Sequence, residues 1–517
     1  MKLDYKKTML VGFAFFLIMA FWQAYDATIP VILTNKFGMS QDWSGVIMAI
    51  DNVLALFMLP LFGAISDKCK AKSGKRTPFI AAGTAIAAVV LVVLSFVDCA
   101  QLKNISEVSK IDDPAALQVI YQTQGNKELK TPEGEEFVLS EVFSQEAFVS
   151  IQSKTMDEET GKEITNKDYM NYVTPARQAY VAEATAKSPN VLICFVALLF
   201  VLLLAMSTFR SPAVALMPDV TIKPLRSKAN AIINLMGTAG GILVLVLGIV
   251  FATSAVENAM MDYIVYYAVI AGIMVAALVV FLLTVKENKW AAQMRQDSVT
   301  YGIEENEEVA EEKRNLSKGE KTSLILILLS VALWYFGYNA VTSKYSVYAA
   351  NILDKDYNMT MLIAQGAAIV AYLPAGMLAS KFGRRKTILA GVVMLAVAFG
   401  VAGFMRAGSP TLVMNILFAM AGIAWATINV NSFPMVVEMC SGSDIGKYTG
   451  YYYTASMAAQ IATPILSGFL MERIAETVMF PYAAIFVALA FVTMAFVRHG
   501  DGKTEAKSGL EAFDIED

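Results

Sequence analysis

The chain has 517 residues, of which 56% are hydrophobic and 17% are charged, and its formal net charge is −4. A soluble protein of this length would not normally be so apolar, so the composition favours an integral membrane protein. The only histidine is His499, and the four cysteines are scattered without metal-binding spacing, so we expect neither a metal site nor a disulfide framework. No catalytic constellation is present, and we do not expect an enzyme.

Apolar runs of about 20 residues recur along the chain, and each is long enough to cross a bilayer about 30 Å thick. About twelve runs can be counted, at roughly 9–33, 43–65, 79–97, 190–216, 229–253, 263–285, 323–350, 358–379, 387–405, 410–434, 448–470 and 478–498. The first run is too long for a signal-peptide core and has no small-residue cleavage site after it, so we predict that it is retained. The pattern predicts an all-α polytopic membrane protein with 12 transmembrane helices.

Two short basic loops, each directly after an apolar run, repeat each other about 313 residues apart. The first loop comprises 63–68 and 74–76, and the second comprises 376–386. The same offset aligns Tyr25-Asp26-Ala27 with Tyr338-Asn339-Ala340. A membrane chain of two related halves is typical of transporters whose halves rock against each other. We therefore predict two pseudo-symmetric halves of six helices.

Lysine and arginine indicate the orientation, because short cytoplasmic loops are rich in both. One side of the chain collects Lys6, Lys7, the 68–76 loop, Lys223, Arg226, Lys228, Lys286, Lys289, the 381–386 loop, Lys447 and Arg498. The short loops of the other side contain almost no cations. With an even number of helices, we expect both termini in the cytoplasm and the protein in the cell membrane.

One insertion breaks the symmetry of the halves. Asp219 and Glu438 each end a helix, but they are 219 rather than 313 residues apart, so the first half has about 94 additional residues. We place them at about 98–189 on the outer side, as a solvated cap or as a lid that contacts substrate or a partner. The expected domains are an N-terminal bundle at 1–285, a cytoplasmic linker at 286–321, a C-terminal bundle at 322–498 and a cytoplasmic tail at 499–517.

Two acids within apolar runs are candidates for binding a coupling cation. Asp26 in the first helix and Asp51 in the second lie at similar depth near the midplane, so both can face one cavity. An aspartate there costs about 2.5–3.5 kcal/mol on insertion scales, so such residues are usually functional. Pro30 removes the N–H that would bond the Asp26 carbonyl, which leaves an oxygen for a cation or water. A purely structural role is the alternative for each acid.

Both acids have neutral counterparts in the second half. At the 313-residue offset the counterparts are Asn339 for Asp26, Ala364 for Asp51 and Gln365 for Asn52. We therefore expect the coupling cation to bind the N-terminal half. Arg210, near the inner end of the fourth helix, can pair with an aspartate when the cation is absent, or can extend to the cytoplasmic surface instead.

Aromatic and amide side chains four residues apart are candidates for the substrate surface, because such pairs share one face of a helix. A flat ring beside hydrogen-bonding amides suits a polyhydroxylated solute with apolar C–H faces. The alternative is ordinary packing between helices. The candidates are Trp22, Gln23, Tyr25, Asn52, Trp334, Tyr338, Asn339, Gln365, Trp425 and Asn429.

Charged residues of the repeated loops are candidates for a cytoplasmic gate, whose ion pairs would break when the halves rock. In the first half the candidates are Asp67, Lys68, Arg76 and Asp219. In the second half they are Lys381, Arg384, Arg385 and Glu438. The alternative is that the basic loops only fix the topology.

The loops resemble those of the major facilitator superfamily, because 376–386 is similar to its loop motif and 63–76 to the expanded form. A narrower similarity is to the sucrose-transporter branch, which is related to the glycoside–pentoside–hexuronide:cation symporters. The segments that resemble this branch are Pro60–Cys69, Gly74–Ile80, Arg210–Asp219 and Ala229–Ala231. The resemblance covers all the helices but not the insertion.

The resemblance implies the major facilitator fold and glycoside uptake driven by H⁺ or Na⁺, with no other cofactor. Melibiose-type members have two acids one turn apart on helix 2, whereas this chain has only Asp51 there. Plant sucrose carriers use an aspartate in helix 4, whereas this helix has no acid before Asp219. We therefore assign the coupling to Asp26 and Asp51, and we favour H⁺ over Na⁺.

The leading hypothesis is a proton-coupled symporter of a glycoside, such as a disaccharide, that works by alternating access. We expect it to act as a monomer in the lipid bilayer, with a sugar as its small-molecule substrate and without a nucleic-acid partner. A second hypothesis is a carrier of amphipathic substrates such as lysolipids or drugs. A third is a membrane sensor that does not transport and would tolerate loss of Asp26.

Overall fold

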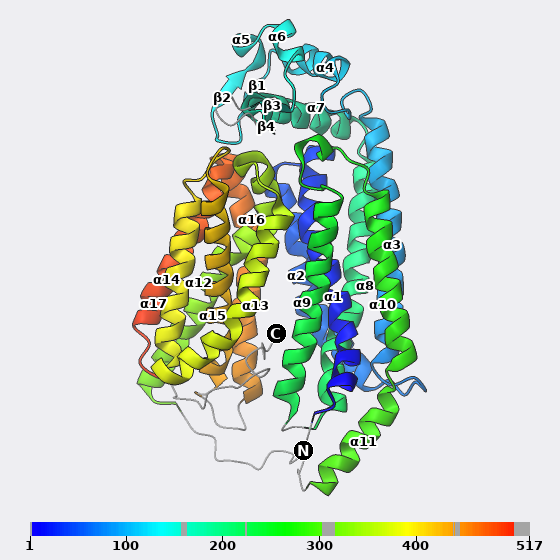
Figure 1. Cartoon of the computed structure of the whole chain (residues 1–517), viewed down its shortest axis with the longest axis vertical. Coiled ribbons are helices and arrows are strands. Elements are labelled where there is room, and N and C mark those ends of the chain that lie inside the picture. The colour runs from blue at the N-terminus through cyan, green and yellow to red at the C-terminus, as the bar shows by residue number, and fades with distance from the viewer. Residues whose placement is uncertain are drawn as a thin grey trace.

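The computed structural model describes residues 3–156, 163–222, 225–301, 316–437, 439 and 445–500. Two bundles of long helices stand side by side, and a small mixed domain lies across one end of both (Figure 1). The N half consists of α1 (Tyr5–Val31), α2 (Gln41–Asp67), α3 (Thr77–Asn104), α8 (Asn190–Val220), α9 (Arg226–Val250) and α10 (Ile264–Thr284). The C half consists of α12 (Lys318–Tyr348), α13 (Tyr357–Phe382), α14 (Arg384–Ala402), α15 (Thr411–Val437), α16 (Ile445–Arg473) and α17 (Met479–Ala495).

Each of the twelve apolar runs forms one of these helices, as predicted. A backbone in lipid has no water to bond, so a long apolar segment satisfies its own N–H and C=O groups as a helix. In the described part of the chain, eleven helices are long and apolar enough to cross a membrane. The twelfth long helix, α13, has 26 residues. In α1 the chain continues past Pro30 into a π-helical turn, Ile32–Lys36.

The halves meet closely at the end beneath the mixed domain. A Cβ on Gly45 of α2 would lie 2.1 Å from the carbonyl oxygen of Pro464 in α16, and one on Gly468 would lie 2.3 Å from that of Gln41. Such small residues let helices approach each other at backbone distance. Farther toward the middle, Gln23 bridges the halves. Its Nε2 donates to Tyr357 (3.1 Å), and its Oε1 accepts from Gln365 (2.6 Å). These contacts close the interface between its middle and this end.

The insertion between α3 and α8 folds into a domain with its own core, which we call the cap (residues 105–189). It contains α4 (Pro114–Gln124), the antiparallel hairpin of β1 (Glu128–Lys130) and β2 (Glu136–Val138), α5 (Leu139–Val142), α6 (Gln145–Val149), the antiparallel hairpin of β3 (Lys154–Met156) and β4 (Glu163–Thr165), a π-helical turn (Tyr169–Val173) and α7 (Thr174–Lys187). Leu117, Ile120, Phe148 and Val173 are fully buried in its core. The cap is therefore a folded domain with a core of its own.

Two predicted domain boundaries shift in the structure. The insertion begins at about 105 instead of 98, because α3 continues past Asp98, whose carboxylate is buried in the bundle against Lys36. The C-terminal bundle begins at Lys318 instead of 322, where Ser317 and Glu320 form a capping box. The linker contributes one helix, α11 (Glu287–Thr300), and then 302–315 lie outside the described residues.

Candidate functional site

The three candidates for cation coupling come together on the inner face of the N half. Asp26 of α1 lies within electrostatic range of Asp51 of α2, and Arg210 of α8 acts in turn on Asp51. The Arg210 guanidinium lies 5.9 Å from the Trp22 ring. Asn52 donates a hydrogen bond to Asp51 through its side-chain amide (2.9 Å). Two acids and one cation from three helices thus form a half-buried cluster.

Several polar atoms beside this cluster are buried and have no hydrogen-bond partner in the described part of the chain. They are Trp22 Nε1 and Tyr25 Oη, and Asn339 Nδ2 next to Tyr338 on α12 is a further buried, unpaired atom in the C half. An unpaired buried polar atom costs about 1–3 kcal/mol, so one that persists commonly serves to bind something. Tyr25 also lies within electrostatic range of Asp26 and Asp51. These atoms come from both halves, so a solute held by them would lie at the interface.

The C half faces the cluster with an aromatic platform. Trp425 of α15 stacks on Tyr338 of α12 with ring centroids 3.5 Å apart and planes within 3°. Tyr335 meets the same Trp425 edge-on at 5.3 Å. Tyr338 lies within electrostatic range of Asp26 of the other half. The platform therefore lies on the side of the C half that faces Asp26.

A cavity of about 220 Å³ adjoins the platform between the halves. Its polar wall includes Gln365, Thr342 and Thr238, and Met19 and Phe418 contribute to its apolar wall. Gln23, on the same level, is buried and hydrogen-bonded to Gln365. This wall is more apolar than the set of amides in the sequence suggested.

Of the candidate substrate residues, three line this cavity, namely Tyr338, Gln365 and Trp425. Trp334 is fully buried in the core of the C half and does not line the cavity, so this part of the prediction needs correction. Tyr335 and Tyr338 are the residues of α12 that meet Trp425, so positions 335 and 338 lie on the face of α12 turned toward the platform, and Trp334 does not. Asn429 is half-buried on α15, one turn from Trp425.

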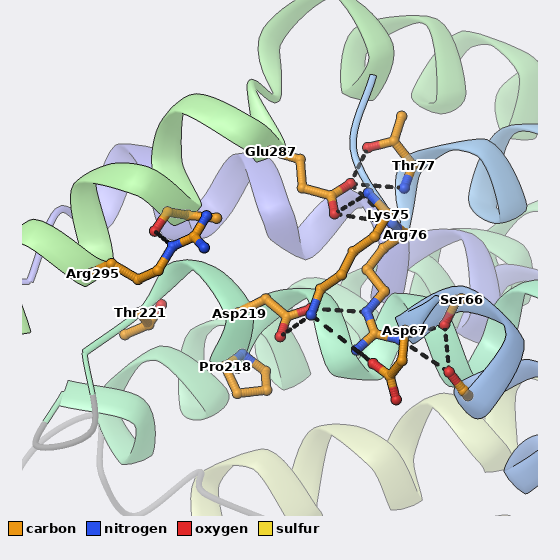
Figure 2. A network of polar contacts seen from close by, with 12 residues as sticks. Ser66, Asp67, Lys75, Arg76, Thr77, Pro218, Asp219, Thr221, Glu287 and Arg295 are labelled. Carbon is orange, nitrogen blue, oxygen red and sulfur yellow. Dashed lines mark hydrogen bonds and ion pairs between the residues drawn. The ribbon is translucent and has the colours of Figure 1, made fainter. Parts of the chain in front are cut away.

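The charged residues of the first loop form a network at the end opposite the cap (Figure 2). The Arg76 side chain is buried and donates to Asp219 of α8 (Nε to Oδ2, 2.8 Å), and it also contacts Asp67 and Ser66 of α2. Lys75 adds a second ion pair to Asp219 at 3.1 Å. All of these residues belong to the N half, so the network joins α2, α3 and α8 and does not itself bridge the halves.

The other gate candidates form different contacts. Lys68 is exposed and forms no ion pair with the described residues. Arg385 donates to the backbone carbonyls of Met494 and Ala495 at the end of α17, where a cation complements the helix dipole. Lys381 lies 5.4 Å from the ring of Phe382, and Arg384 is buried at the start of α14. Glu438, their predicted partner, lies outside the described residues.

Glu287 of the linker helix α11 is the central acceptor of the same network, and the sequence analysis missed it. Its carboxylate accepts the backbone N–H groups of Lys75 (2.8 Å), Arg76 (2.9 Å) and Thr77 (2.8 Å), and the Thr77 hydroxyl (2.7 Å). A carboxylate at a helix N-terminus satisfies N–H groups that the helix cannot pair itself. Gly74 has φ +128°, and a Cβ there would lie 2.0 Å from the Glu287 carboxylate. The glycine of the loop motif was the available signal.

A second buried network lies beneath the cap and crosses between the halves. Lys344 of α12 is fully buried, and its Nζ donates to the backbone carbonyl of Gln41 in α2 (2.7 Å). The Gln41 N–H donates to Glu472 of α16 (2.8 Å), and its side chain donates to Glu476 (3.2 Å). Asn351 also donates to Glu476 (3.0 Å). The signal for this network was the lysine that interrupts an otherwise apolar run.

The geometry agrees with comparisons to known proteins. A model of the MFS_1 like family matches residues 9–482. The MFS-type transporter ppzB of Metarhizium rileyi is 29% identical over 143 residues, 28% of this chain and 28% of that protein. The match therefore spans less than a third of the relative. The ppzB of Metarhizium majus is 30% identical over 124 residues, 24% of this chain and 26% of that one.

Solved transporters have a similar fold. A D-xylose-proton symporter has a TM-score of 0.58 at 15% identity, over 97% of this chain and 100% of the other. A mutant of the nucleoside transporter NupG has a TM-score of 0.54 at 14% identity, over 95% and 100%. These similarities confirm the predicted fold of two six-helix halves. The chain therefore belongs to the MFS_1-like family, and it is a multi-pass membrane protein.

Proposed function

We propose that this transporter couples the movement of a glycoside to that of H⁺ by alternating access. The observation that carries the proposal is the meeting of Asp26, Asp51 and Arg210 with the platform of Tyr338 and Trp425 at the interface of the halves. A proton acceptor and a sugar-sized stacking surface in one site let one rocking motion move both solutes. An aromatic face binds the C–H face of a sugar ring, and unpaired polar atoms bind its hydroxyls.

In this mechanism the protonation state of the acids decides whether the substrate-loaded protein can change from the outward-facing to the inward-facing state. With both acids ionised, Arg210 compensates one charge and leaves the other exposed in a low-dielectric interface, which opposes closure. Protonation of Asp26 removes that charge, and a bound sugar then satisfies the polar atoms that the interface would otherwise bury unpaired. One charge moved per cycle supplies about 2.3 kcal/mol per 100 mV. That supports about 50-fold accumulation of the substrate.

The basic loops favour a topology with the cap outside and both termini in the cytoplasm. In this topology the close contacts between α2 and α16 close the outer side of the described conformation. The cell membrane is the expected location, because the coupling needs a membrane with an inward proton gradient. Substrate would leave the site on the side of the 63–76 loop.

A carrier of amphipathic substrates is the second candidate, and the cavity favours it. Beside the platform the cavity is lined by Met19, Ile369, Phe399 and Phe418, which would hold an acyl chain or a ring system. Its volume of about 220 Å³ is below the usual range of about 300–1,000 Å³ for ligand pockets. A full lysolipid would therefore need a wider site than this conformation has.

The test is uptake into proteoliposomes of a panel of labelled mono- and disaccharides, with lysolipids in parallel. Wild type and Asp26→Asn are compared under an inward pH gradient and in counterflow without a gradient. We expect gradient-driven accumulation of one glycoside, its loss in Asp26→Asn, and retained counterflow in that variant. Asp168→Asn, on the exposed surface of the cap, is the control for loss of an acidic charge. Absence of sugar uptake by wild type under both pH and Na⁺ gradients would refute the proposal, and lysolipid movement would replace it.

A further inference from the structure

The cap is fixed to the N half and would move with it. The Gln101 side chain of α3 donates to the Lys36 carbonyl (2.8 Å) and to Thr185 of α7 (3.0 Å), and all three residues are buried. Gly38 has φ +62° and lies against the backbone of α7, where a Cβ would come within 2.3 Å of the Ala182 nitrogen. An ion pair between Lys154 and Glu257 adds a contact to the loop before α10. The cap is also joined covalently to α3 at one end and to α8 at the other, and both helices belong to the N half.

The same cap contacts all three loops that connect C-half helices at the capped end. Its β1–β2 turn (131–134) contacts the loop between α16 and α17, where the Glu476 N–H donates to the Pro132 carbonyl (3.0 Å). Glu133 of this turn pairs with Arg406 in the loop between α14 and α15 (3.1 Å). Thr165 at the end of β4 donates to Asp354 in the loop between α12 and α13. The cap thus bridges the halves over their whole outer face.

The turn reaches the network that closes this end. Glu476 uses its N–H to bind the cap, and its carboxylate accepts from Gln41 of the N half and from Asn351 of the C half. Gly134 has φ +92°, and its Cα lies so close to the α16–α17 loop that a Cβ would be 2.5 Å from the Ile474 carbonyl oxygen. Any rotation that separates α2 from α16 must therefore also lift the turn off this loop.

The route from this side into the interface passes beneath the cap. A cavity of about 530 Å³ lies between the β1–β2 turn, α7 and the adjacent ends of both halves. Gln178 of the cap, Gln41 of the N half and Glu472 of the C half are among the polar residues that line it. Three bodies thus enclose the entrance, and it widens only if the cap leaves the C half.

We propose that the cap is a conformational latch, in which the 131–134 turn and Thr165 hold the C half against the N half and favour the state that is closed beneath the cap. This inference rests on the alternating access of the proposed function, but not on the identity of the substrate or of the coupling ion. Because the cap is fixed to the N half, every change to the state that is open beneath the cap breaks the contacts between the cap and the C half. The latch thus sets the population of the two states.

The test measures opening at the capped end directly, without substrate. Ser44 is fully buried at the start of α2 and directly precedes Gly45, which packs against the backbone of α16, so we expect it to become more accessible when the halves separate there. In a background with serine at the four native cysteine positions, Ser44→Cys is labelled in intact cells by a membrane-impermeant maleimide applied from outside. Asp168→Cys on the exposed cap surface reports that the reagent reaches this side.

Two changes release the latch, and one control matches them. Gly134→Ala places a Cβ against the Ile474 carbonyl, and Glu133→Ala with Thr165→Ala removes side-chain contacts without backbone strain. We expect each to raise the labelling rate of Ser44→Cys about fivefold, the effect of one lost hydrogen bond. Gly408→Ala introduces similar strain, at φ +87°, but its Cβ meets nothing within 4 Å, so labelling should stay at the wild-type rate.

A disulfide tests the opposite direction. A Cβ on Gly134 would lie 2.9 Å from the Ala475 Cβ, so Gly134→Cys with Ala475→Cys can form a disulfide after a shift of under about 1 Å. We expect oxidation to abolish both the labelling of Ser44→Cys and transport, and a reductant to restore transport and to raise labelling to the rate of the Gly134→Ala variant, because Gly134→Cys places the same Cβ against the Ile474 carbonyl. Unchanged labelling in both release variants, or labelling at the wild-type rate in the oxidised protein, would overturn the latch. Because labelling needs no sugar and no gradient, a failed uptake assay would leave this result standing.

Discussion

The buried ion pair of Lys36 and Asp98 gives a quantitative test of how the N half is held together. Lys36, the last residue of the π-helical turn after α1, lies against α3 and the segment just before α10, and the side chains of Lys36 and Asp98 are almost completely buried. Its ammonium donates to both Asp98 oxygens (2.6 and 2.8 Å) and to the Met261 carbonyl (2.7 Å). An ammonium has three N–H donors, and here each has an acceptor. The Tyr263 ring lies 4.4 Å from the same nitrogen.

The change Asp98→Asn removes the negative charge and leaves the ammonium buried with one carbonyl and one amide oxygen. Loss of one partner of a buried ion pair typically costs about 3–5 kcal/mol. Replacement of both partners by apolar residues of similar volume removes the two desolvation penalties together, and is commonly neutral or stabilising. We therefore expect Asp98→Asn to lower the free energy of unfolding by about 3–5 kcal/mol. Lys36→Met with Asp98→Leu should recover most of this loss.

The measurement is chemical unfolding of the purified protein in detergent, followed by tryptophan fluorescence. Glu136→Gln is the matched control, because it breaks an exposed ion pair to Lys130 on the cap, at 3.3 Å, where such pairs contribute about 0–1 kcal/mol. If Asp98→Asn costs no more than this control, or if the double change is less stable than the single one, the assignment of a tightly desolvated pair is refuted.

Three further predictions concern the network of Glu287 and Asp219 and the platform of Tyr338 and Trp425. Glu287→Ala leaves the N–H groups at the start of α3 unpaired and should lower the free energy of unfolding by about 1–3 kcal/mol in the same assay. Gly74→Ala should have a similar effect, because its Cβ would clash with the Glu287 carboxylate. Trp425→Ala removes the stack on Tyr338, and the KM for the transported sugar should rise about 2–10-fold in uptake assays, with no effect if the platform does not bind it. Asp219→Asn removes the charge that Lys75 and Arg76 share, so it should lower the free energy of unfolding in detergent more than Lys75→Ala does. A larger loss in Lys75→Ala than in Asp219→Asn would contradict the proposed network.

The helices, and the nearness of three charged residues within them, were predictable because their signals are local. A continuous run such as that of α10 forms a helix in lipid whatever its neighbours are. An acid in such a run is costly unless it serves a function, which pointed to Asp26 and Asp51, and Arg210 lies near them as expected. The sequence alone did not reveal that the stack of Tyr338 on Trp425 joins two helices far apart in the chain.

The parts that the sequence analysis missed depend on contacts between distant segments. The hairpins of the cap have three-residue strands, too short for a recognisable alternation of side chains. Glu287 resembled any acid of a polar linker, and only its approach to the N–H groups of Arg76 and Thr77 distinguishes it. Trp334 had the same spacing as the cavity residues, and its burial follows from the packing of α12 in the C half.

The place of the cap in the chain has a consequence for biogenesis. Residues 105–189 leave the ribosome before any part of the C half is made, and domains generally fold in the order of their synthesis. The cap has its own buried core and is attached to α1 and α3, so it can be complete when the loops at Asp354, Arg406 and Glu476 emerge. Each newly made helical hairpin of the C half then meets a folded domain that already presents the contacts for its connecting loop.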